Sequence, residues 1–169
     1  ESGLMLGLAA VVDIDTPSLA GQTAEYSFKQ LMDYQLGYRD SRAMKKAVRK
    51  LTPKDMADLA VYYEGLPEAT QPVKDASLVA RGEALYRGGD LDKGIAACLA
   101  CHGPSGLGNP AAKYPALRGQ HADYTAKQLN DYAAGTRTSD GATNVMRDIA
   151  ARLSADDIAA LSSYVQGLR

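Results

Sequence analysis

Apolar and polar residues along the chain follow a helical pattern. Ala122, Ala126, Leu129 and Ala133 recur at steps of three and four, which places them on one stripe of a helix that ends at Gly135. No stretch of the sequence shows the alternation of apolar and polar residues that is typical of a β-strand. The pattern therefore predicts an all-α protein.

Helix start signals occur at matching places in the two halves of the chain. Thr52 and Ser154 are predicted N-caps, and an aspartate lies three residues after each of them, at Asp55 and Asp157. A hydroxyl cap accepts a hydrogen bond from a free backbone N–H, and an acidic residue in the first turn interacts favourably with the helix dipole. Helices are therefore predicted after both caps. A further helix is predicted over residues 78–89, in the second half alone.

The sequence contains a long internal repeat. Residues 17–39 align with residues 115–137 without a gap, and thirteen of the twenty-three positions are identical. After a deletion of four residues in the first copy, residues 51–66 match residues 153–168. This repeat indicates a duplicated helical domain, with a segment rich in Pro and polar residues as the linker. The predicted division is a first domain over residues 1–67, a linker over 68–79 and a second domain over 80–169.

Composition and charge limit the classes of function. Hydrophobic residues make up 46% of the chain and charged residues 23%, which is ordinary for a globular protein. The formal net charge of −1 gives no overall field for nucleic acid, and the chain has no phosphate-binding glycine loop, so no nucleic-acid partner is expected. One Phe, no Trp and ten Tyr provide little aromatic bulk, which suggests packing around a group that is not protein.

Both cysteines of the chain lie in the motif Cys98-Leu-Ala-Cys101-His102, for which three uses compete. A redox disulfide would assign no role to His102. A structural zinc ion needs four ligands, and the only other histidine in the sequence is His121. Covalent attachment of haem c uses the whole motif, because both thiols bond to the porphyrin and the histidine ligates the iron. We therefore interpret the motif as a haem c attachment site.

A second ligand for the haem iron is predicted at Met146. It is the one methionine of the second copy, and the register of the repeat places Met44 of the first copy opposite it. A lone methionine is otherwise a common filler of helical cores. Met and His together raise the reduction potential and leave no open position for a substrate. His121 is the alternative ligand, but it is expected to begin a helix, and its counterpart in the first copy is Thr23.

These motifs carry a resemblance to a known family. Residues 78–169 resemble a class I cytochrome c domain, and the doubled pattern P-x-L-x-G-Q…Y…Q-L…Y…G-x-R…M…L…Y resembles the two-haem cytochrome c4 family. The resemblance implies two tandem helical domains related by a pseudo-twofold axis. It also implies a periplasmic electron carrier, not an enzyme, that passes electrons between respiratory redox proteins and a terminal oxidase. Association with a membrane surface is left open.

The resemblance assigns roles to individual residues of this chain. Cys98 and Cys101 would hold the haem, His102 and Met146 would ligate its iron, and Pro115 would orient the His102 ring through its carbonyl group. The same resemblance implies a crossing of the first and last helices of the second domain. The residues packed at that crossing would be Gly82, Tyr86, Leu161 and Tyr164.

The first copy departs from the family pattern. It has no Cys and no His, and Glu1–Leu4 align with Pro104–Leu107, which directly follow the haem motif. We expect either that upstream residues carry a second haem motif or that the first domain no longer binds haem. Two observations favour an upstream motif. Met44 lies at the position of an iron ligand in the repeat, and without an upstream helix the apolar face of the helix predicted over 52–66 would be left uncovered, at a cost in free energy. Leu4–Val12 would then belong to a loop that covers the haem.

Two other functions stay open on the sequence alone. The chain could be the cytochrome subunit of an oxidoreductase complex, such as a flavoprotein sulfide dehydrogenase. Alternatively, the first half could be a haem-free docking module in which a basic run steers an acidic partner. That run comprises Arg42, Lys45, Lys46, Arg49 and Lys50. A solvent-exposed helix face is the simpler explanation of these charges.

Overall fold

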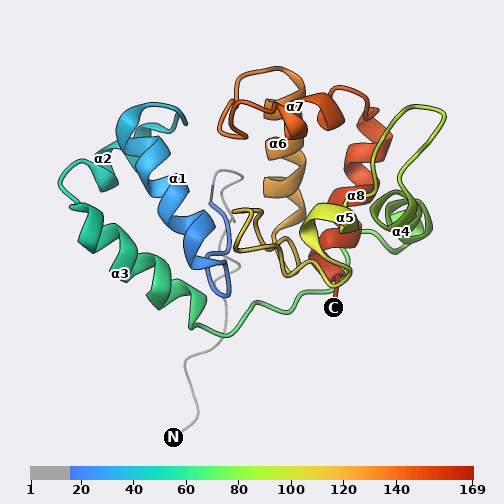
Figure 1. The fold of residues 1–169 in the computed structure, drawn as a ribbon. Coiled ribbons are helices and arrows are strands. Elements are labelled where there is room, and N and C mark those ends of the chain that lie inside the picture. The colour runs from blue at the N-terminus through green and yellow to red at the C-terminus, as the bar shows by residue number, and fades with distance from the viewer. Residues whose placement is uncertain (1–15) are drawn as a thin grey trace, which may run out of the picture.

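The computed structural model describes residues 16–169, so the predicted loop Leu4–Val12 lies outside the described residues. The described part is helical, with two isolated β-bridges and no β-strand, which confirms the all-α prediction (Figure 1). Its elements are α1 Ala24–Leu36, α2 Arg42–Val48, α3 Pro53–Glu64, η1 Ala76–Leu78, α4 Val79–Gly88, α5 Leu99–His102, α6 Ala122–Ala133, α7 Val145–Ala150 and α8 Ala155–Gly167. Within this part, no helix has the length and apolar character needed to cross a membrane.

The helices form two groups that lie side by side, as Figure 1 shows. In the first group, α1 packs against α2 and α3. In the second group, α8 packs against α4 and α6, and α6 packs against α7. The two groups contain the two copies of the sequence repeat, so the tandem arrangement is confirmed.

Paired hydrogen bonds between the two groups follow the pseudo-twofold symmetry. The side chain of Gln22 donates to the carbonyl oxygen of Ala116 at 2.9 Å and accepts from its backbone N–H at 2.8 Å. Gln120, the counterpart of Gln22, makes the same two bonds to the backbone of Ser18, also at 2.9 and 2.8 Å. Each glutamine therefore binds the backbone of the other domain.

The predicted N-caps are confirmed at the start of α3 and α8. The hydroxyl groups of Thr52 and Ser154 accept from the backbone N–H groups of Asp55 and Asp157. The aspartate side chains accept in return from the backbone N–H groups of the caps, which completes a capping box at each helix. Pro53 occupies the first turn of α3, where a missing N–H costs no hydrogen bond.

α4 and α8 cross at very short range, as the resemblance implied. A Cβ atom on Gly82 would lie 2.4 Å from the carbonyl oxygen of Ala160, so only glycine fits at the crossing. One turn further along, the rings of Tyr86 and Tyr164 pack with their centroids 5.6 Å apart. Tyr86 and Leu161 are buried in the core of the second domain.

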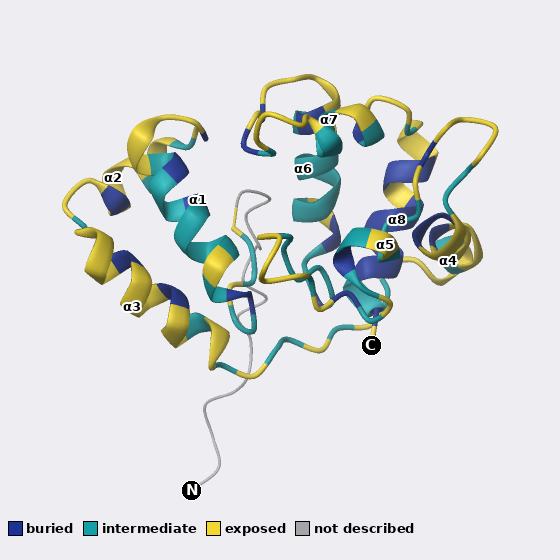
Figure 2. Ribbon diagram, in the orientation of Figure 1, coloured by how far each residue is buried: buried dark blue, intermediate teal, exposed yellow. Residues whose placement is uncertain are grey.

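The equivalent faces of α3 and α8 differ sharply in burial (Figure 2). Leu161 and Tyr164 of α8 are 3% and 7% exposed, because α4 covers them. Their counterparts on α3, Leu59 and Tyr62, are 36% and 61% exposed. Val61 on the same helix is 62% exposed. The described part of the first domain thus has an apolar helix face that is covered in the second domain.

The linker is docked on the second domain along much of its length. The backbone at Ala69 passes so close to Gly119 that a Cβ atom on Gly119 would lie 2.0 Å from the Ala69 carbonyl oxygen. Gln71 donates to the Gly119 carbonyl oxygen at 3.1 Å, and Gln166 of α8 donates to that of Pro72 at 2.8 Å. The end of the predicted linker forms η1 and the first residue of α4.

Asp157 links the start of α8 to α4 and to the loop that follows α4. One carboxylate oxygen accepts from Arg81 Nη2 at 2.7 Å, and the other accepts from Lys93 Nζ at 2.8 Å. Burial of the carboxyl group acts to raise its pKa. Hydrogen bonds from Lys93, Arg81 and Ser154 outweigh that effect and hold the pKa of Asp157 well below its ordinary value.

Replacing Asp157 with asparagine should lower the free energy of unfolding by about 2 kcal/mol at neutral pH, because charge-assisted bonds are lost. A depressed pKa in the folded state stabilises the fold above the unfolded-state pKa, and this contribution declines as the pH falls. The difference from wild type should therefore shrink toward about pH 3. Asp55→Asn is the matched control, since Asp55 caps α3 from an exposed position. Urea unfolding at both pH values measures the effect, and an equal loss in both variants would contradict it.

Candidate functional site

The cysteines and the histidine of the motif lie on one turn of α5. Cys98 is the N-cap of this helix, and the backbone N–H of His102 donates to the Cys98 carbonyl oxygen at 2.9 Å. Residues at positions i, i+3 and i+4 share one side of a helix, which brings Cys98, Cys101 and His102 together. Gly103, with φ of 79°, ends the helix directly after the histidine.

His102 is buried and oriented by the backbone. Its Nδ1 atom lies 2.9 Å from the carbonyl oxygen of Pro115, the contact that the resemblance implied. A carbonyl oxygen only accepts, so Nδ1 carries the proton and Nε2 carries the lone pair. Burial lowers the pKa of His102 although the bond to Pro115 acts in the opposite direction, which favours the neutral ring. Among the described residues no hydrogen bond uses Nε2, so this atom is available to a metal ion.

Both cysteines are free and half-buried. Burial raises the pKa of the Cys98 thiol to about 11, so this sulfur is protonated at neutral pH. Within residues 16–169, no cluster of three or more His, Cys, Asp or Glu is arranged to hold a metal ion. Two sulfur atoms beside an imidazole with a free Nε2 fit the attachment of haem c, in which thioethers fix the macrocycle and the imidazole binds its iron.

Met146 lies on α7, in the same domain as the motif but on a different helix. It is half-buried, and α7 packs against α6. The turn before α7 is fixed by Asp140, which accepts from the backbone N–H of Arg147 at 3.1 Å and from Arg147 Nε at 2.9 Å. Asn144 precedes the helix in the left-handed region, with φ of 53°. The position of Met146 is thus defined by a polar turn.

The other candidate residues lie apart from α5. Met44 is half-buried on α2 in the first domain, and its backbone N–H donates to Ser41 Oγ at 3.3 Å. His121 begins α6 as predicted, and its Nδ1 atom is 3.1 Å from Gln71 Nε2 of the linker. The basic run on and after α2 is exposed, and Lys45 pairs with Asp40 at 2.7 Å.

The polar residues that join the two domains were not predicted from the sequence. Arg39 and Arg137 end the two aligned segments of the repeat, and both are only 7% exposed. Gln30 and Gln128 are likewise identical in the two copies, and Gln30 is buried. One feature of the sequence could have identified these residues: the same polar residue occurs at the same place in both copies. Polar positions on the surface have little reason to stay identical after duplication.

The chain is similar to known electron-transfer proteins over most of its length. The cytochrome c family profile matches residues 79–169. Cytochrome c4 of Pseudomonas aeruginosa is 49% identical over 152 residues, which cover 90% of this chain and 75% of that protein. The crystal structure of reduced recombinant cytochrome c4 from Pseudomonas stutzeri matches with a TM-score of 0.89 and 44% identity, covering 93% of this chain and 87% of that one. A thiosulfate dehydrogenase electron acceptor of Stutzerimonas stutzeri is 35% identical, covering 94% of this chain and 72% of that protein.

These similarities include both copies of the repeat, and the high TM-score shows that the two domains are arranged as in a cytochrome c4. They confirm the class I cytochrome c fold, haem c as the cofactor and electron transfer as the function. The chain belongs to the cytochrome c4 family of electron-carrying cytochromes.

Proposed function

We propose that this protein is a periplasmic carrier that passes single electrons between respiratory redox proteins and a terminal oxidase. The observation that carries the proposal is the single turn of α5. It presents two thiols and one oriented imidazole, Cys98, Cys101 and His102, in a chain of the cytochrome c4 family. When bound, haem c supplies a centre that gains and loses one electron.

The proposed roles of the site residues follow from their chemistry. Cys98 and Cys101 hold the haem through thioether bonds, and His102 ligates the iron through Nε2. The Pro115 carbonyl fixes the tautomer and strengthens the imidazole as a donor. Met146 is the second ligand, which raises the reduction potential and closes the iron to substrates. Tyr86 supports the site from α4, because its hydroxyl donates to the Gly103 carbonyl oxygen at 2.7 Å.

We extend the proposal to a second haem in the first domain, with Met44 as a ligand of its iron. The support comes from the comparison of α3 with α8. Leu59 and Tyr62 are exposed at the positions where Leu161 and Tyr164 lie under α4. A helix equivalent to α4 that packs on α3 would bury these side chains and complete a second site. Two haems would let the protein store two electrons and deliver them one at a time.

The natural full-length protein should be isolated from its native cells to test location, stoichiometry and function together. We expect holoprotein in the periplasmic fraction, two haems per polypeptide, and oxidation of the reduced protein by membranes that contain a terminal oxidase. A cyanide-treated membrane sample is the control, because it should leave the protein reduced. Holoprotein in the cytosolic fraction, or no oxidation by active membranes, would refute the carrier. One haem per polypeptide would refute the assignment of Met44.

A second candidate function is the cytochrome partner or subunit of an oxidoreductase complex, of which a flavoprotein sulfide dehydrogenase is one example. The similarity to a thiosulfate dehydrogenase electron acceptor favours this class. A permanent subunit requires a large interface, whereas a carrier uses a small and transient one. Co-purification of a stoichiometric enzyme from native membranes or periplasm at high salt would favour the complex. A monomeric cytochrome under the same conditions would favour the carrier.

A further inference from the structure

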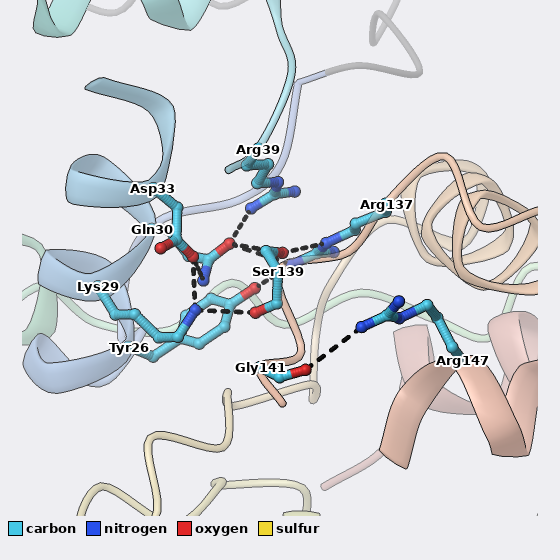
Figure 3. Close-up of polar contacts among 9 residues, drawn as sticks. All are labelled: Tyr26, Lys29, Gln30, Asp33, Arg39, Arg137, Ser139, Gly141 and Arg147. Carbon is cyan, nitrogen blue, oxygen red and sulfur yellow. Dashed lines mark hydrogen bonds and ion pairs between the residues drawn. The ribbon is translucent and has the colours of Figure 1, made fainter. Parts of the chain in front are cut away.

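Six polar residues form an interdomain clamp, part of which Figure 3 shows. The clamp consists of Tyr26, Gln30 and Arg39 of the first domain and Tyr124, Gln128 and Arg137 of the second domain. Each residue of the first domain has an identical counterpart in the second, at the same place in the repeat. The clamp therefore lies on the pseudo-twofold axis between the two domains.

Each arginine of the clamp reaches into the other domain. Arg39 donates to Gln30 of its own domain at 2.7 Å, and to Tyr124 and Gln128 of the other domain at 2.7 and 2.9 Å. The guanidinium group is held by these three oxygen acceptors while its flat face lies over the ring of Tyr34, 4.8 Å from the centroid. A small rotation of one domain would break several of these bonds at once.

Arg137 repeats this arrangement from the opposite side. It donates to Gln128 of its own domain at 2.7 Å, and to Tyr26 and Gln30 of the first domain at 2.8 and 3.2 Å. Its guanidinium group lies over the ring of Tyr132, 4.5 Å from the centroid. Each glutamine oxygen thus accepts from both arginines, so the two positive charges lie close together.

The charges of the clamp have no carboxylate partner among the described residues. Burial is the largest influence on Arg137 and lowers its pKa, and the charge of Arg39 acts in the same direction, but Tyr26, Tyr132 and Tyr124 together outweigh them and the pKa of Arg137 is raised. Burial likewise opposes ionisation of Tyr26, but the arginine charges lower its pKa below the usual value. Amide and phenol oxygens of the clamp accept hydrogen bonds from both cations. One carboxylate contacts the clamp indirectly, because Gln30 Nε2 donates to Asp33 Oδ2 at 3.3 Å and Lys29 pairs with the same group.

The clamp is joined to α7 by the stretch between α6 and α7. Arg137 lies in this stretch and donates through Nε to Ser139 Oγ at 3.0 Å, and Lys29 of α1 donates to the Ser139 carbonyl oxygen at 2.8 Å. Further along, Arg147 of α7 donates to the Gly141 carbonyl oxygen at 3.3 Å (Figure 3). The helix that carries the proposed iron ligand is therefore connected to the clamp by a short polar chain of contacts.

We propose that the interdomain clamp is linked to the redox state: its positive charges favour reduction of the second domain, and reduction tightens the clamp. This inference rests on the proposed function. One electron from a one-electron donor lowers the positive charge of the second domain, with no bond formed or broken and no proton required. The added negative charge offsets the repulsion between Arg39 and Arg137. By thermodynamic linkage, the closed clamp favours reduction by the same free energy by which reduction favours the closed clamp.

The expected effect of one clamp charge is about tenfold. A unit charge that acts across roughly 10 to 15 Å, in a medium with an effective dielectric constant near 20, changes an equilibrium by about this factor. Removing one arginine charge should therefore lower the ratio of reduced to oxidised protein about tenfold at a fixed ambient potential. For a one-electron centre this corresponds to a fall of about 59 mV in midpoint potential.

The test compares full-length holoprotein variants by spectroelectrochemical titration. Arg39→Gln and Arg137→Gln should both lower the midpoint potential of the second domain. Arg39→Lys should have a midpoint potential close to that of the wild type, because the charge is kept. Arg42→Gln is the control, since it removes the same charge from an exposed position on α2 where solvent screens it. A potential that falls equally in Arg39→Gln and Arg42→Gln, or that falls as far in Arg39→Lys as in Arg39→Gln, would overturn the proposal.

Hydrogen exchange on the wild-type protein gives an independent readout if the variants fail to fold. Backbone amides of residues 134–144 and of α1 should exchange more slowly in the reduced protein than in the oxidised protein, because the clamp opens less often. Residues 53–64 of α3 serve as the internal control and should show no such difference. Equal exchange of the clamp segments in both redox states would overturn the proposal. Failure of the proposed function is distinct, because a protein without covalent haem would give no redox titration at all.

Discussion

Replacing both Cys98 and Cys101 with alanine is expected to abolish covalent haem attachment. Both thioether bonds are lost, and His102 alone cannot hold the cofactor when the protein unfolds. After denaturing electrophoresis the wild-type band should retain peroxidase staining, whereas the double variant should give a colourless band. Each single variant keeps one sulfur and should retain part of the stain.

The contrary outcome of this experiment is clear. If the double variant kept haem on the polypeptide, another residue would be the attachment point and the assignment of the α5 turn would be wrong. His102→Ala separates attachment from ligation, because it leaves both thiols in place and removes the imidazole. It should keep some covalent haem but change the spectrum of the iron.

Met146→Ala should lower the reduction potential of the second domain by on the order of 0.1 V. Axial ligands set haem potentials over about 0.8 V, and a thioether favours the ferrous state. The variant should also lose the weak absorption band of thioether-ligated ferric haem near the red end of the visible spectrum. Redox titration of the full-length holoprotein, followed by absorbance, measures both effects.

The two other candidate ligands provide the controls for Met146. His121→Ala should leave the potential of the second domain unchanged, since its Nδ1 atom is engaged with Gln71 and the residue begins α6. Met44→Ala should likewise spare the second domain and affect only a haem in the first. A potential that moved with His121→Ala and stayed constant in Met146→Ala would refute the ligand assignment.

Local chemistry explains which features the sequence predicted well. Capping at Thr52 and Ser154 depends on side chains within three residues of each helix start, so the short-range pattern contains the whole interaction. The grouping of Cys98 and His102 is equally local, because one helical turn brings them together. The crossing of α4 and α8 was predicted from the family resemblance, and Gly82 is the residue that permits the close approach of the two helices.

Long-range contacts explain what the sequence could not predict. Leu59 and Leu161 occupy the same place in the same pattern, yet their burial differs because, within residues 16–169, α8 has a helix packed on that face and α3 has none. The bonds of Arg39 to Tyr124 and Gln128 join residues more than eighty positions apart, and no local pattern specifies such pairs. The geometry of the interdomain clamp therefore becomes visible only in the folded chain.

The docked linker determines where domains of related cytochromes could be exchanged. Glu68 forms an ion pair with Arg118, and the Ala69 carbonyl oxygen occupies the space where any side chain on Gly119 would begin. Ala69 and the residues that follow it are thus docked on the second domain, although the repeat ends before them, while the Glu68 side chain also lies against Gly21 of the first domain. A chimera joined ahead of Glu68 would keep the contacts between the linker and the second domain. A junction at Val79 would instead place the linker of another protein on a surface that is shaped for this linker.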